Sequence, residues 1–208
     1  MTDPLHQAVR TAQARLAERL ELASAAMAEH ISTREIIART DAFLVNTCRH
    51  AAAMCDQVLP AARAHMPQGD ARVQAYLEQC RRMERAVMRA KQRMYGEAHA
   101  VSASWTQVWA AVIDEVRALH ALEDDLVEDL GRAEGAPDRA RIARHLHAVS
   151  MAAPTRPHPR SPHLGRIAHV TRRFWARADQ FWDNAEGRTV VDRPAPAEAA
   201  GDREDLAS

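Results

Sequence analysis

Histidine and carboxylate residues are the main candidates for chemistry in this sequence. His50 and His120 lie on the apolar faces of two predicted helices, where a buried imidazole needs a polar partner. Imidazole and carboxylate groups that project from facing helices bind iron or manganese in helical bundles. The alternative interpretation is structural, because a buried histidine and glutamate would also hydrogen-bond to each other in a metal-free bundle.

Helical rise brings these candidates to one level of an antiparallel bundle. Each residue rises about 1.5 Å, so partners at one height are mirror positions about the connecting turn. The mirror position of His50 about a turn near Pro67 is Glu84. The mirror positions of residues 80–84 about the next turn, near Ala100, are residues 116–120, which end at His120. Glu123 follows His120 by one turn. We therefore predict a metal site made of His50, Glu84, His120 and Glu123, and we identify no catalytic residue.

Three consecutive acidic residues follow His120, and helical phase ranks them. Glu123 comes three residues after His120 and faces the same way, whereas Asp124 and Asp125 come four and five residues after it. We expect Glu123 to be the inward carboxylate, with Asp124 next.

Other chemistries lack their usual motifs. The sequence contains no GxxxxGK[ST], GxGxxG, GxSxG, HExxH or CxxC pattern. Nucleotide binding, nucleophilic catalysis and zinc-finger interpretations therefore have no support from short motifs. An enzymatic activity is left open, and a binding protein is the favoured interpretation.

Long helices must position the candidate residues. The apolar residues are mainly Ala, Leu, Val and Met, which favour helices, and the first of only seven glycines is Gly69. We predict an all-α fold: an up-down-up-down antiparallel four-helix bundle with additional C-terminal helices. Apolar seams predict helices over residues 5–30, 36–61, 73–94 and 105–130, and a fifth over 137–149.

Local signals predict where these helices begin and end. Ser32 with Glu35 forms a capping-box pattern at the start of the second helix. Asp70 is the expected cap of the third helix, and either Ser102 or Ser104 is the expected cap of the fourth. Gly131 and Gly135 are expected to end the fourth helix, and Pro137 to open the fifth.

The composition changes after residue 152. Prolines and arginines dominate the next stretch, so we predict an extended segment and a sixth helix over 153–192, packed on the bundle, and a disordered tail over 193–208. The arginines between Arg156 and Arg177 could bind phosphate groups, but packing of their aliphatic stems on the bundle is the favoured interpretation.

Charge and cysteine content narrow the cellular setting. The 208 residues carry 28 basic and 28 acidic side chains, so a nucleic-acid partner is disfavoured. The polar start predicts no signal peptide, no apolar stretch is long enough to span a membrane, and the three cysteines form no CxxC pair. We expect a cytoplasmic protein with buried, inert thiols, and a homodimer is possible.

The segment from Val116 to Leu126, with His120 followed by acidic residues and a leucine, resembles the last ligand-bearing helix of hemerythrin-like (HHE cation-binding) proteins. Cys48-Arg49-His50, running to Pro60, is similar to the second helix of that family. Residues 93–99, 153–159 and 181–188 further resemble a bacterial subgroup with a C-terminal extension. The resemblance implies that residues 1–152 form the hemerythrin-like bundle and its fifth helix, and that iron is the metal.

The resemblance also implies which ligands are present. Hemerythrins carry a histidine on the first helix, HxxxE on the second, HxxxH on the third and HxxxxD on the fourth. This chain keeps only the last pattern, as His120 with Asp125, and has Met54 where the second helix would supply a carboxylate. The expected function is therefore iron binding at an incomplete or vestigial site that handles or senses oxygen, nitric oxide or peroxide. The alternative is a metal-free bundle that serves as a scaffold or interaction protein.

Overall fold

The computed structural model describes residues 3–29, 32–94, 102–133, 135 and 138–151. In these ranges all regular structure is helical, which confirms the all-α class. The helices are α1 (Pro4–Ala28), α2 (Thr33–Gln57), α3 (Leu59–His65), α4 (Gly69–Met94), α5 (Trp105–Arg132) and α6 (Arg139–Met151).

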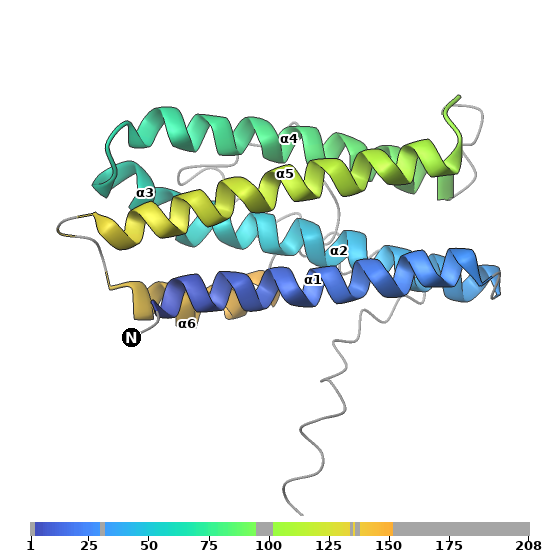
Figure 1. Ribbon diagram of the computed structural model, residues 1–208, viewed down its shortest axis with the longest axis horizontal. Coiled ribbons are helices and arrows are strands. Elements are labelled where there is room, and N and C mark those ends of the chain that lie inside the picture. Colours follow the sequence, from blue (N-terminus) through green and yellow to red (C-terminus); the bar gives the residue numbers. More distant parts are fainter. Residues whose placement is uncertain (1–2, 30–31, 95–101, 134, 136–137, 152–208) are drawn as a thin grey trace, which may run out of the picture.

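The four longest helices lie side by side along the long axis of the molecule (Figure 1). Helix α1 contacts α2 and α5, and α4 contacts the same two helices, so the four enclose a common core. The short helix α3 connects the ends of α2 and α4, while α6 packs against α1 and α2. Helix α6 corresponds to the predicted fifth helix, and it buries Ile142 and Leu146.

Side-chain caps set the starts of the bundle helices. Asp3 accepts a hydrogen bond from the Leu5 amide at the start of α1, and Ser32 accepts one from the Glu35 amide at the start of α2. Of the two candidate serines before α5, Ser104 is the cap, and it forms a reciprocal capping box with Gln107. These contacts satisfy amide groups that the first helical turn leaves without partners.

The predicted second helix is divided in two, which corrects the expected range of 36–61. Helix α2 ends at Gln57, and α3 begins at Leu59 with Pro60 in its first turn. Proline has no backbone N–H, and its ring clashes with the preceding helical turn, so the helix cannot continue through Pro60. The connection to α4 is therefore a short helix.

Two predicted helix ends also differ. Helix α4 begins at Gly69, one residue before the expected cap Asp70, whose carboxylate instead lies 2.7 Å from Arg63 Nε. Helix α5 continues through Gly131 to Arg132. Gly131 does not end the helix. Glycine can adopt the left-handed conformation that ends helices, but it can also keep the helical conformation.

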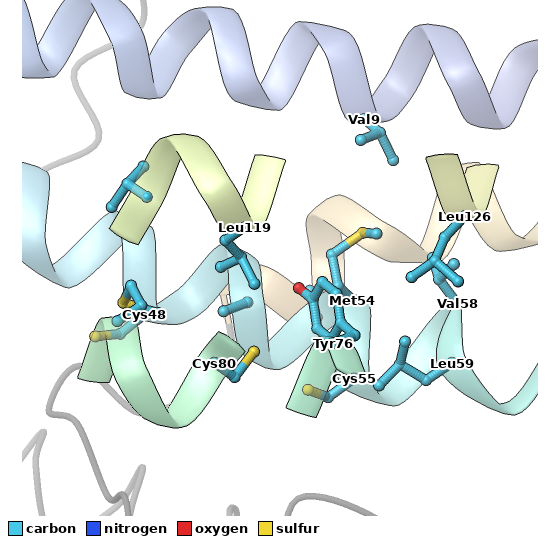
Figure 2. Packing of buried hydrophobic residues seen from close by; sticks show 14 of the residues in the cluster. Val9, Cys48, Met54, Cys55, Val58, Leu59, Tyr76, Cys80, Leu119 and Leu126 are labelled. Carbon is cyan, nitrogen blue, oxygen red and sulfur yellow. The ribbon is translucent and has the colours of Figure 1, made fainter. Parts of the chain in front are cut away.

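The core is made of aliphatic, sulfur-containing and aromatic side chains from every helix. Its members include Val9, Met54, Tyr76, Leu119 and Leu126 (Figure 2). All three cysteines are buried, as the sequence analysis expects.

Several predictions fall outside the described residues. They are the extended segment, sixth helix and tail over 153–208, the Pro137 start of the fifth helix, and the arginines that would pack on the bundle. None of the helices in the described ranges has the length and apolar character that a membrane crossing requires.

Gly69 lies where α3 and α4 meet, and a side chain would not fit there. A Cβ atom on Gly69 would lie 2.6 Å from the Ala62 carbonyl oxygen and 2.7 Å from the Arg63 carbonyl oxygen. Both are backbone atoms, so the two helices would have to separate. We expect Gly69→Ala to lower the free energy of unfolding by about 1–3 kcal/mol, measured by urea denaturation.

Gly131→Ala is the matched control. Its Cβ would meet only the carboxylate tip of Asp3, at 3.0 Å, and alanine favours a helix interior over glycine. We expect little change in stability. An equal loss of stability for both variants would contradict the steric argument for Gly69.

Candidate metal centre

The centre of the site is the carboxylate of Glu123 on α5, which is completely buried. A buried carboxylate loses its hydration. This loss costs several kcal/mol unless nearby charges and hydrogen bonds compensate it. The compensating groups come from the three other long helices. Glu123 therefore connects all four long helices through its side chain.

Each oxygen of Glu123 has a partner. His50 Nε2 on α2 lies 2.9 Å from Oε2, and Gln13 Nε2 on α1 donates to the same oxygen at 3.1 Å. The Tyr76 hydroxyl on α4 donates to Oε1 at 2.9 Å. Gln13 Nε2 also lies 3.3 Å from the backbone oxygen of His120, so it links α1 to both α5 residues of the site.

His50 and Glu123 form a buried ion pair. Burial alone would lower the pKa of His50, but the charge of Glu123 and the hydrogen bond to it raise this pKa above its ordinary value. Burial alone would raise the pKa of Glu123, yet His50 holds it below the ordinary value. Both shifts favour a protonated imidazole beside an ionised carboxylate.

His120 differs from His50 because its Nε2 atom is buried and has no hydrogen-bond partner among the described residues. Its ring meets that of His50 edge to face, with the centroids 6.1 Å apart. Burial lowers the pKa of His120, and the nearby His50 lowers it further, against the opposing effect of Glu123. The lowered pKa favours an uncharged imidazole, whose buried Nε2 has no hydrogen-bond partner among the described residues.

Asp124 lies at the edge of the site. One of its carboxylate oxygens, Oδ2, pairs with Arg10 NH1 at 2.8 Å, and the other, Oδ1, is buried without a hydrogen-bond partner among the described residues. Asp124 follows His120 by one helical turn, so both unsatisfied atoms lie on the same side of α5. Asp125, which the family pattern would use, is exposed.

The structure brings three of the four predicted residues together. Ligand atoms of His50, His120 and Glu123 all lie within 4.8 Å of one another. Glu84 does not belong to this group, and the inward side chain that α4 supplies at this level is Tyr76. The inward orientation of Glu123 is confirmed, while the role of these residues as metal ligands stays a prediction.

The short helix α3 explains why Tyr76 stands where Glu84 was expected. Because α2 ends at Gln57 and α4 begins at Gly69, the mirror point between them is residue 63 rather than residue 67. Reflection of His50 through residue 63 gives Tyr76, two helical turns before Glu84. Pro60, which divides the helix, was the sequence signal for this shift.

The hydrogen bonds of Gln13 and Tyr76 to Glu123 were not predicted from the sequence. Gln13 lies in the predicted helix over 5–30 and Tyr76 in the predicted helix over 73–94, but neither was named as a candidate. A buried tyrosine hydroxyl and a buried amide each need a polar partner. Both side chains lie on inward helical positions, and this combination of burial and polarity was the available signal.

Searches against protein-family models, curated proteins and solved structures found no match for this chain. The resemblance to hemerythrin-like proteins therefore stays a prediction.

The ion pair predicts a specific pH dependence in metal-free protein. The depressed pKa of Glu123 contributes stability above the ordinary value of 4.5, which is lost as the pH falls through the folded-state pKa. The raised pKa of His50 contributes stability below the ordinary value of 6.5, which is lost as the pH rises through the folded-state pKa. We expect His50→Gln to lower the free energy of unfolding by about 3 kcal/mol. This loss should be largest between pH 4.5 and 6.5, where both groups contribute stability.

The measurement is urea denaturation from acidic to alkaline pH in the presence of a chelator. His65→Gln is the control, because His65 is exposed on α3, and its effect should be small at every pH. A penalty for His50→Gln that does not change with pH would contradict the ion pair.

Proposed function

We propose that this chain is a hemerythrin-like protein that binds a single iron ion through His50, His120 and Glu123. The observation that carries the proposal is the buried Nε2 of His120, which has no hydrogen-bond partner among the described residues and lies beside an ionised, buried carboxylate. Buried polar atoms normally have partners. A cation shared with His50 and Glu123 would satisfy this nitrogen.

The spacing of the donors supports a shared ion. Two ligands about 2.1 Å from one metal ion lie roughly 3.0 Å apart at a right angle and roughly 3.4 Å apart at a tetrahedral angle. His50 Nε2 and Glu123 Oε2 are separated by 2.9 Å, which fits neighbouring positions of an octahedral site. His120, within 4.8 Å of both residues, would move closer to complete the set.

The donor types favour iron. Two imidazoles and one carboxylate with open positions are the facial ligand set of non-haem Fe(II) sites. The hydrogen bonds of Gln13 and Tyr76 to Glu123 would orient the carboxylate, as partners of metal ligands commonly do. The coordination positions that the protein leaves open are available to a small ligand, and the family resemblance suggests oxygen, nitric oxide or peroxide.

Metal binding is tested with full-length protein that is stripped by a chelator, loaded anaerobically with Fe(II) and desalted. We expect about one iron per chain by elemental analysis. His120→Gln should reduce the iron content severalfold or more, because it removes one of only three donors. The same substitution should leave metal-free stability nearly unchanged, because Nε2 has no hydrogen-bond partner among the described residues.

His65→Gln is the matched control and should retain full iron content. Loading with Zn(II) in parallel compares the two metals, and iron should compete successfully under anaerobic conditions. Equal iron in wild type and His120→Gln would contradict the proposed ligand set. The absence of any tightly bound metal would favour the alternative, a metal-free bundle in which the His50–Glu123 network is purely structural.

A further inference from the structure

Cys55 and Cys80 form a pair of buried thiols that the proposed metal site does not use. Cys55 lies in the last turn of α2 and is 2% exposed, while Cys80 lies on α4 and is 1% exposed. The two helices are in contact. Figure 2 shows the two sulfur atoms turned toward one another, next to Tyr76.

The two thiols are direct neighbours. Cys55 is close enough to Cys80 to raise the pKa of its thiol, and both cysteines are close enough to Tyr76 to act electrostatically on its hydroxyl. A disulfide needs its sulfur atoms about 2.05 Å apart, so the two thiols have to move toward one another before they can bond. The position of Cys55 favours this movement, because α2 ends two residues later at the break before Pro60.

We propose that Cys55 and Cys80 are an oxidative modification site, at which a peroxide converts the two thiols into a disulfide that links α2 to α4. This inference is independent of metal binding. It concerns a side-chain pair on the Tyr76 side of the core, and neither thiol belongs to the His50–His120–Glu123 group.

The reaction balances with hydrogen peroxide as the oxidant. One thiol attacks the peroxide as its thiolate, which forms a sulfenic acid and releases water. The second thiol then attacks the sulfenic sulfur, which forms the S–S bond and releases a second water. The two cysteines together lose two electrons and two protons, and the peroxide is reduced to water.

Burial determines the expected rate. Burial raises the pKa of Cys80 well above its ordinary value, and the neighbouring Cys55 adds to this effect. Because the thiolate is the reactive form, oxidation of the folded protein is expected to take minutes to hours rather than seconds.

Cys48 provides an internal control. It is also buried, but it lies two helical turns before Cys55 on the same helix, about 10.5 Å away along the axis. The separation is too large for a disulfide between these two residues. Once Cys55 and Cys80 are linked, Cys48 has no other cysteine in the chain to pair with, and we expect it to stay reduced.

The test treats full-length, metal-free protein with hydrogen peroxide in the presence of a chelator, then alkylates free thiols in denaturant. We expect a mass loss of two hydrogen atoms, a fall from three reactive thiols to one, and a Cys55–Cys80 peptide in a non-reducing digest. Dithiothreitol should restore all three thiols. The linked protein should melt higher, by on the order of 10 °C, because the bond constrains the unfolded chain.

Variants make the assignment specific. Cys48→Ala should form the same link, whereas Cys80→Ala should form none. The proposal is overturned if all three thiols remain after a day of treatment, if the disulfide contains Cys48 or joins two chains, or if Cys55 and Cys80 reach sulfinic or sulfonic acids without linking. The wild-type peptide map alone distinguishes these results, so the conclusion does not depend on the folding of any variant.

Discussion

The buried carboxylate of Glu123 is the constraint on which the rest of the structure depends. An ionised group without hydration is stable only if donors reach both of its oxygens. His50, Gln13 and Tyr76 supply these donors, and each belongs to a different long helix. A helix that slid along its neighbours by one turn would leave a charge or a hydrogen-bond donor buried without a partner. The network therefore sets the relative heights of α1, α2, α4 and α5, whereas hydrophobic contacts alone would tolerate several registers.

The connections between helices are part of the same constraint. Pro60 stops α2, and α3 then carries the chain to α4 within a few residues. The close contact of α3 with the start of α4 requires glycine at position 69, because any Cβ atom would collide with backbone oxygens. As a result α4 begins near the level at which α2 ends, and Tyr76 reaches Glu123. The site therefore depends on a proline and a glycine that lie outside it.

The charge distribution is compatible both with a stable metal-free bundle and with the proposed metal site. In metal-free protein the shifted pKa values favour a proton on His50, which balances the charge of Glu123. A divalent cation would take over that role, displace the proton and engage His120, whose Nε2 has no hydrogen-bond partner among the described residues. Tyr76 and Gln13 could keep their hydrogen bonds to the carboxylate in both states. Metal binding would then require small movements of side chains rather than a rearrangement of helices.

The sequence by itself determined the all-α class, the approximate span of the long helices, several caps, and the inward positions of His50, His120 and Glu123. These features depend on helix propensity and on helical periodicity. Both are set by residues close together in the sequence, whatever the distant residues are. Only the tertiary structure decided that Tyr76, rather than Glu84, faces Glu123, that Asp125 points to solvent, and that Cys55 meets Cys80. Those outcomes depend on the relative heights of different helices. A connection that begins a few residues earlier in the chain shifts the facing position on the next helix by about two turns.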